Sequence, residues 1–155
     1  MSFHGEFLQL MSPVGKYKGW KPAEQQTLSY LLPACARSSQ SALFLVAYAQ
    51  LWDAEVVVRS AAEGSLKFCY LLQNQKDFEQ RHREYSHDLW RIALLKDHRK
   101  AEEFLAAVLD PNDPKWKPIR DRLLDKEQFD EITRSYPQAI RRALDSKWGF
   151  TGLIV

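Results

Sequence analysis

The segment from residue 54 to residue 73 constrains the fold more than any other part of the sequence. Apolar side chains recur in it at helical spacing and cover most of the circumference of the helix that they predict. A helix that is apolar on nearly every side packs against several neighbours, so we expect this one to lie at the centre of the fold. Asp53, which precedes it, is a suitable N-cap residue. The apolar residues of the segment are Val56, Val57, Val58, Ala61, Ala62, Leu66, Phe68, Cys69, Leu71 and Leu72.

Two longer stretches on either side also have helical periodicity. Residues 23–49 are rich in Ala, Leu and Gln, and Pro33 interrupts them. A kink at Pro33 and a new helix with Pro33 in its first turn both fit this pattern. Residues 78–109 predict one long helix, either straight or bent near Leu95 and Lys96.

The C-terminal third predicts shorter helices. Asp113 followed by Pro114 is typical of a helix start, with the aspartate as cap and the proline in the first helical position. Short helices are expected over residues 116–124, 128–135 and 138–146.

No segment alternates polar and apolar residues between hairpin turns, so we predict an all-α protein. The expected architecture is a small helical bundle with a central apolar helix and one long helix, bent or straight. Residues 1–21 are expected to form an irregular N-terminal arm, which Tyr17 and Trp20 fasten to the body, and residues 22–155 a single domain. The apolar ending Leu153-Ile154-Val155 indicates either a tail that packs into the bundle or the front part of a longer protein.

Composition excludes several classes of function. The chain has 155 residues, with 22 Lys and Arg against 20 Asp and Glu. Its net charge of +2 is far from the strongly basic charge that is typical of a duplex-DNA binder. No apolar stretch is long enough to span a membrane. The glycines form no phosphate-binding loop, and no Cys or His spacing resembles a metal site, so we expect no cofactor and no metal. Cys35 and Cys69 are expected to be buried thiols in a reducing cytoplasm.

A line of alternating charges runs along the central helix. Glu55, Arg59, Glu63 and Lys67 are each four residues apart, so their side chains share one face. The plain interpretation is a ladder of ion pairs on the least buried face. The alternative is a binding role, in which Arg59 and Glu63 are partly buried and Arg59 orients a phosphate or a partner's carboxylate.

A second cluster of candidate functional residues lies in the long helix. Three of the four histidines fall between residues 82 and 98, and the sequence from Arg81 is rich in arginine. On a continuous helix Arg83, His87, Arg91 and His98 lie near one face, at separations of 4, 4 and 7 residues. An arginine beside a histidine suits metal-independent RNA cleavage, because histidine exchanges protons near neutral pH and arginine stabilises charge on a phosphate. The alternative is an ordinary solvated face. The candidate catalytic residues are Arg81, Arg83, His87 and His98, and the candidate binding residues here are Arg91 and Arg99.

The stretch AEVVVRSAAEGSLKFCYLL, residues 54–72, resembles the Arg-Ser-x-x-Glu helix of an uncharacterised family of all-helical bacterial proteins. The resemblance includes Arg59-Ser60 with Glu63-Gly64, the segment from Lys96 to Arg99, and the ending Lys147-Trp148-Gly149-Phe150. That family in turn resembles HEPN domains, helical ribonucleases of toxin–antitoxin and phage-defence systems.

HEPN ribonucleases carry an Arg, a polar residue and, after four to six intervening residues, a His. Arg81-His82 followed by His87 fits that pattern, and Arg91 followed by His98 fits its spacing, although Ile92 is not polar. The resemblance implies an active site formed by two such pairs across a homodimer.

Two functional hypotheses follow from these observations. The first is a HEPN-like protein of a bacterial defence or toxin–antitoxin system that binds or cleaves RNA without a metal. The second is a non-catalytic helical module that binds a protein partner or self-associates. The charged ladder and the apolar tail favour this hypothesis. Exposure of His87 and His98 separates them, because a buried histidine has no access to RNA.

Overall fold

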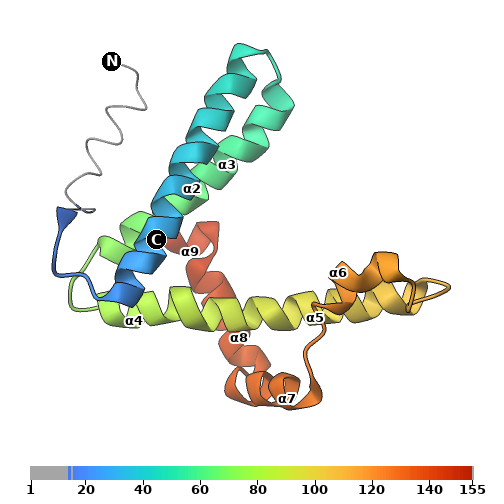
Figure 1. The fold of residues 1–155 in the computed structure, drawn as a ribbon. Helices are drawn as coiled ribbons and strands as arrows, with labels where there is room; N and C mark the ends of the chain where they lie inside the picture. The colour runs from blue at the N-terminus through green and yellow to red at the C-terminus, as the bar shows by residue number, and fades with distance from the viewer. Residues whose placement is uncertain (1–13, 15, 155) are drawn as a thin grey trace. The chain divides into compact units, whose positions relative to one another are not determined.

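The computed structural model describes residues 14 and 16–154, and every regular element among them is helical (Figure 1). The predicted all-α class is therefore confirmed. The elements are α2 (Pro22–Ala47), α3 (Leu51–Leu72), α4 (Phe78–Arg83), a π-helical turn (Glu84–Asp88, the π-turn), α5 (Leu89–Ala107), a 3₁₀ turn (Pro114–Trp116), α6 (Lys117–Arg120), α7 (Lys126–Ser135), α8 (Gln138–Trp148) and α9 (Phe150–Ile154).

The chain divides into two compact units. Among the described residues, unit 1 contains residues 14, 16–82 and 150–154, and unit 2 contains residues 83–149. That residues 22–155 form a single domain stays a prediction. The predicted irregular arm falls largely on residues 1–13 and 15, which lie outside the described part of the chain; Val14 and Lys16 have helical backbone.

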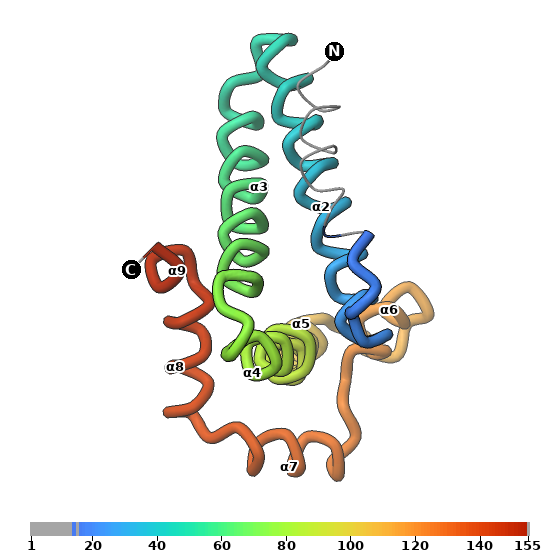
Figure 2. The backbone as a smooth tube through the Cα atoms, turned by 90° about the vertical axis from the view of Figure 1, so that its left-hand side faces the viewer, coloured from blue at the N-terminus to red at the C-terminus, as the bar shows by residue number. Residues whose placement is uncertain are grey.

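Unit 1 is built on an antiparallel hairpin of α2 and α3 (Figure 2). Small residues line the seam between the two helices, so that the backbones approach closely. Gly64 shows how closely: a Cβ atom at this position would lie 2.6 Å from Sγ of Cys35 on α2. The buried small residues of the seam are Cys35, Ala36, Ala42, Ala54 and Ala61.

Pro33 lies inside α2, which runs unbroken from Pro22 to Ala47. Of the two sequence alternatives, a new helix beginning at Pro33 is therefore wrong. Proline removes one helical hydrogen bond, but Leu31 and Cys35 on either side are buried, and their packing offsets that loss.

The turn between α2 and α3 is short and closed by backbone hydrogen bonds. Ala49 N–H donates to the carbonyl of Val46 at 3.0 Å and Gln50 N–H to that of Leu45 at 2.9 Å, the pattern of a Schellman motif. Ala49 has a positive φ of 58°, a conformation that glycine adopts more easily than alanine.

This tight turn starts α3 earlier than the sequence predicted. The N-cap is Gln50 and α3 begins at Leu51, so the prediction that Asp53 caps the helix is wrong. Asp53 lies in the first turn of α3, where its negative charge still interacts favourably with the helix dipole.

Aromatic residues pack at the base of the hairpin. The ring of Trp20 lies 5.1 Å from that of Tyr17 and 5.2 Å from that of Phe78 at the start of α4, and its Nε1 donates to the carbonyl of Val14 at 2.8 Å. The expectation that Tyr17 and Trp20 fasten this segment to the body holds for the described residues of unit 1. In the same unit α9 contacts α3, so the described part of the apolar tail packs onto the fold.

Unit 2 has its own apolar core. Ile92 and Leu95 of α5 pack with Ile132 of α7 and with Tyr136, which directly follows α7. Partly buried side chains that pack against this cluster are Leu94, Leu124, Phe129 and Leu144.

The predicted helix start after the long helix is confirmed. Asp113 is the N-cap of the 3₁₀ turn, its side chain accepts from Lys115 N–H, and Pro114 takes the first position. The long helix has no break near Leu95, because α5 is continuous through that residue. The departure from α-helical geometry lies earlier, at the π-turn.

The strained turn residue gives a test of the hairpin. We expect Ala49→Gly to stabilise the protein by about 0.5–1 kcal/mol, because relief of an αL alanine outweighs the added entropy of the unfolded chain. Ala47→Gly, two residues earlier and inside α2, should instead destabilise it by a similar amount, about 0.5–1 kcal/mol. Urea unfolding of both variants measures the difference. A change in the free energy of unfolding with the same sign for both variants would contradict the turn described here.

Candidate functional site

The π-turn places the candidate site in unit 2. The N–H of Leu89 donates to the carbonyl of Glu84, five residues back rather than four. This widened turn is the point at which the chain presents His87 and Asp88. Such single π-turns inserted between α-helical segments are frequent at functional sites.

Buried contacts of Glu84 hold the π-turn in place. Its carboxylate accepts hydrogen bonds from Nζ of Lys147, at 2.8 Å and 2.7 Å to its two oxygens, and from Nε1 of Trp148 at 3.0 Å. The ring of Tyr85 lies 5.3 Å from that of Trp148. The start of the turn is thereby fixed to the end of α8.

His87 is oriented by a carboxylate and a phenol. Its Nδ1 lies 3.0 Å from Oδ1 of Asp88, and the hydroxyl of Tyr136 donates to the same oxygen at 2.7 Å. Nδ1 also lies 3.4 Å from the hydroxyl oxygen of Tyr136. A carboxylate only accepts, so the proton of a neutral His87 lies on Nδ1, and Nε2 keeps its lone pair.

Exposure differs sharply within this group. The side chain of His87 is 53% exposed, whereas that of Asp88 is 14% exposed and Tyr136 is buried. The ring that can exchange protons therefore faces solvent, and the groups that orient it lie behind it.

The pKa of Tyr136 reflects the charges around the site. Burial, together with the hydrogen bond to Asp88 and the charge of that carboxylate, raises the pKa of Tyr136 to about 12. The positive charges of Arg91 and Arg83 act in the opposite direction on the same pKa. Both arginines therefore lie within electrostatic range of the cluster around His87.

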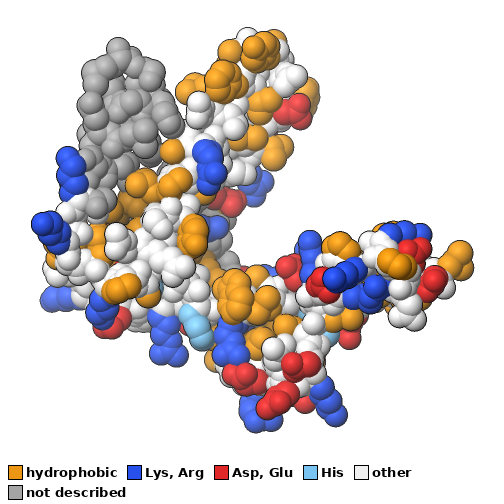
Figure 3. Space-filling view, viewed as in Figure 1, with side chains coloured by type: hydrophobic (Ala, Val, Ile, Leu, Met, Phe, Trp, Pro, Cys, Tyr) orange, Lys and Arg blue, Asp and Glu red, His pale blue; other side chains and the backbone are white. Residues whose placement is uncertain are grey.

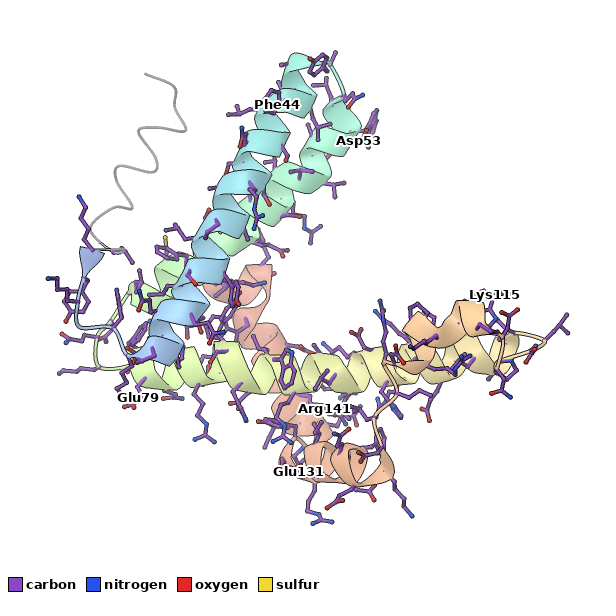
Figure 4. All side chains as sticks on the ribbon, in the orientation of Figure 1. Phe44, Asp53, Glu79, Lys115, Glu131 and Arg141 are labelled. Atoms are coloured by element: carbon purple, nitrogen blue, oxygen red, sulfur yellow. The ribbon has the colours of Figure 1, made fainter. Side chains whose placement is uncertain are left out.

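The two arginines are held differently. Nη2 of Arg91 donates to Oε1 of Glu131 at 2.7 Å, which ties α5 to α7, and the side chain of Arg91 is 21% exposed. Glu131 is labelled on α7 in Figure 4. Arg83 is exposed, and within the described part of the chain no ion pair holds it. Arg83 is thus the more available cation.

A shallow pocket of about 270 Å³ adjoins His87. Trp90 borders it and is 59% exposed, so a flat aromatic face lies at the edge of the pocket. Arg91 and His87 contribute polar groups, Gln128 of α7 adds an amide, and Glu131, which is paired with Arg91, adds a carboxylate. The pocket can therefore offer one stacking surface, a paired cation and a proton acceptor to a ligand.

His98 is in a different environment from His87. It is buried, its Nδ1 accepts from Leu124 N–H at 3.0 Å, and its Nε2 lies 3.3 Å from Oε1 of Glu102. Its ring packs 4.9 Å from that of Phe129. Both ring nitrogens are occupied, so His98 holds α5 to the segment before α7 and lacks the access that catalysis on RNA requires.

Arg81 belongs to unit 1 and is used there structurally. Its Nη1 donates to the carbonyl of Tyr70 at 2.7 Å, its Nη2 to Asp77 at 3.3 Å, and its guanidinium lies 4.1 Å from the centre of the Tyr70 ring. The side chain is 12% exposed. These contacts fix the connection between α3 and α4.

Among the residues that the structure describes, the charged line on α3 forms one ion pair. Nε of Arg59 lies 3.5 Å from Oε1 of Glu63, and the two side chains are 74% and 32% exposed. The alternative in which Arg59 is partly buried is therefore wrong, whereas Glu63 is half-buried. Lys67 is half-buried and Arg99, on α5, is exposed. Cys69, expected to be buried, is exposed, whereas Cys35 is buried.

Three site residues were missed by sequence reasoning: Asp88, Trp90 and Tyr136. Asp88 was visible as the neighbour of His87, but adjacent residues of a regular α-helix point apart. Tyr136 lies 49 residues from His87, and nothing local in the sequence connects them. Within residues 14 and 16–154, no three His, Cys, Asp or Glu side chains are grouped as a metal site.

Tyr136→Phe tests the buried hydrogen bond to Asp88. Below pH 10 the variant should be less stable by about 1.5–3 kcal/mol, because a bond to a charged acceptor is lost. The raised pKa of Tyr136 means that its contribution is complete below the ordinary value of 10.0 and is lost as the pH rises to about 12. Urea unfolding across this range should show the two proteins converging. A constant difference would contradict the assignment.

His98→Ala and His87→Ala should differ in stability. Removing the buried ring of His98 leaves a cavity and takes the acceptor from the part-buried N–H of Leu124, so we expect a loss of roughly 2 kcal/mol or more. Removing the exposed His87 should change the free energy of unfolding by less than about 1 kcal/mol. Chemical unfolding checks both values. Equal losses would show that the two histidines do not have these separate roles.

Comparison with known proteins identifies a family but no activity. The model of a family of unknown function, DUF5677, matches residues 25–148, a range that contains every residue of the site described above. No curated protein and no solved structure matches the chain. The predicted membership of an uncharacterised helical family is confirmed: the chain belongs to the DUF5677 family.

Proposed function

We propose that the protein is a HEPN-like, metal-independent endoribonuclease whose reacting group is His87. The observation that carries this proposal is the exposed ring of His87, held through Nδ1 by Asp88 and backed by Tyr136. A histidine fixed in this way presents Nε2 as a proton acceptor in a defined direction.

The proposed reaction needs only a proton acceptor and a cation. Nε2 of His87 takes the proton of a ribose 2′-hydroxyl, and the 2′-oxygen attacks the adjacent phosphorus. A 2′,3′-cyclic phosphate forms as the bond from phosphorus to the 5′-oxygen breaks. The proton held by His87 then passes to that leaving oxygen, so that the histidine returns to its neutral form.

Arg83 and Arg91 are assigned to the phosphate. Both lie within electrostatic range of Tyr136, and Arg83 is exposed, so Arg83 is expected to meet the phosphate first. Trp90, at the edge of the pocket, offers a face on which a base can stack. His98 and Arg81 are left out, because their polar groups are occupied.

The cellular setting is part of the proposal and depends on the HEPN resemblance. It is a bacterial defence or toxin–antitoxin system, with RNA as the substrate and the cytoplasm as the location. Among the described helices, none is long and apolar enough to cross a membrane.

A second candidate function is favoured by a separate observation in unit 1. The α2–α3 hairpin exposes large apolar side chains around its turn, among them Trp52 at 86% and Tyr48 at 76%. Apolar surface of this extent is typical of a protein–protein contact. A helical interaction module that binds a partner or self-associates would use it.

The nuclease proposal is tested with labelled single-stranded RNA in the presence of EDTA. We expect the parent chain to leave cyclic-phosphate ends, and His87→Ala to slow cleavage by about 100-fold or more, the usual share of general acid–base catalysis. Arg83→Ala should also slow it. Lys100→Ala, an exposed cation further along α5, is the matched control and should cleave as the parent does.

Two results would contradict the proposal. One is intact RNA with the parent chain at high concentration. The other is cleavage that survives in His87→Ala, which would assign it to another group or to a contaminating nuclease. A DNA strand of the same sequence must stay intact in every reaction, since it has no 2′-hydroxyl.

A further inference from the structure

A second pocket lies at the base of the α2–α3 hairpin, and the nuclease proposal makes no use of it. Its volume of about 460 Å³ falls within the range of ligand pockets, which is roughly 300–1,000 Å³. Tyr17, Trp20 and Phe78 line it with aromatic side chains, and Glu24 of α2 contributes a carboxylate. Every residue that lines this pocket belongs to unit 1.

The three aromatic rings form a wall that is not flat. The plane of the Trp20 ring is inclined by 74° to that of Tyr17 and by 44° to that of Phe78. Gly19 permits this position of Tyr17, because a Cβ atom on residue 19 would collide with the Tyr17 ring. The face of an aromatic ring is negative, and rings that meet at an angle attract a cation from more than one side.

The carboxylate in the pocket has only one of its two oxygens in use. Glu24 is buried, at 8% exposed. Its Oε2 accepts from the backbone N–H of Lys21 at 2.8 Å, which caps the start of α2. Within residues 14 and 16–154, its Oε1 forms no hydrogen bond and no ion pair. A buried carboxylate is stabilised by an opposite charge, so the pocket favours a cationic ligand over a neutral or an anionic one.

The one cationic residue among those that line the pocket has a partner of its own. Nζ of Lys21 lies 3.0 Å from Oε1 of Glu79, which Figure 4 labels on α4. The hydrogen bond and charge of Glu79, followed by the charge of Glu24, raise the pKa of Lys21. Figure 3 shows further Lys and Arg side chains along the outer edge of this end of the unit, but among the described residues none of these lines the pocket. Two carboxylates therefore act on one ammonium group, and the net charge at the pocket is negative.

We propose that this pocket binds a trimethylammonium group. A primary ammonium has three N–H donors that need acceptors, and the pocket offers few besides Glu24 and the amide of Gln75. A trimethylammonium group has no N–H donor and carries its charge on an apolar surface, which suits the aromatic rings and the side chain of Leu72. Small molecules of the choline type and trimethylated lysine side chains both carry this group. The inference is independent of RNA cleavage.

Isothermal titration calorimetry of the full chain with choline tests the proposal. We expect a dissociation constant of about 1 mM or less. The neutral analogue of choline, in which a carbon atom replaces the nitrogen, has the same shape and should bind about 10-fold more weakly or worse. The amide of N-acetyl-trimethyl-lysine is the second cationic probe. If it binds more tightly than choline, the ligand is a modified side chain, and if it binds more weakly, the ligand is a small molecule.

Three variants separate the contributions of charge and ring. Glu24→Gln keeps an oxygen that caps α2 but removes the charge, so it should weaken choline binding by about 10-fold or more and leave the neutral analogue unaffected. Tyr17→Leu removes a ring that is 57% exposed, and should weaken choline binding by about 3–5-fold. Glu55→Gln removes an exposed carboxylate of α3 that does not line the pocket, and this matched control should bind choline as the parent does.

Circular dichroism must show that the variants keep the helical content of the parent. No heat of binding with either cationic probe at millimolar concentration would overturn the proposal. Equal affinity for choline and its neutral analogue would also overturn it, as would a Glu24→Gln variant that binds choline as the parent does. Failure of the nuclease proposal appears elsewhere, in the RNA assay of His87 variants, and leaves these outcomes unchanged.

Discussion

The close approach of α2 and α3 is the constraint on which unit 1 depends. Gly64 faces Cys35 at a distance that leaves no room for a Cβ atom, and the buried alanines continue the same seam toward the turn. Near the turn, where the seam consists of small residues, the larger apolar residues of both helices lie on the outer surfaces, whereas Leu31 and Phe68 nearer the base are buried. The packing that closes the hairpin thus leaves the end near the turn apolar on the outside.

Unit 2 depends on a different kind of contact, a buried carboxylate with its donors. The carboxylate of Glu84 accepts hydrogen bonds from the side chains of Lys147 and Trp148. The π-turn that begins at Glu84 contains His87 and Asp88. Breaking one partner of a buried ion pair is costly, because the other charge is left without compensation. The site around His87 is therefore positioned by residues near the end of α8, far away in sequence.

The sequence predicted the helical elements better than the details of the site. Periodicity was sufficient for α2, α3 and α5, and the pair Asp113 and Pro114 marked a helix start correctly. It was harder to predict which side chains of the long helix share one face. A π-turn adds one residue, which rotates all later side chains by about 100° relative to a regular helix. His87 and His98, which α-helical spacing placed near one face, consequently differ, one exposed and one buried.

The hairpin also has a consequence for synthesis of the chain. Its contacts join residues that are near in sequence, and the loop between its helices is very short, so little loop-closure entropy opposes its formation. Both helices are complete once Leu72 has left the ribosome, before any residue of unit 2 emerges from it. The apolar end of the hairpin is therefore presented on the nascent chain. Apolar surface that is exposed during synthesis is prone to aggregation, and this end of the hairpin is the kind of surface on which chaperones act.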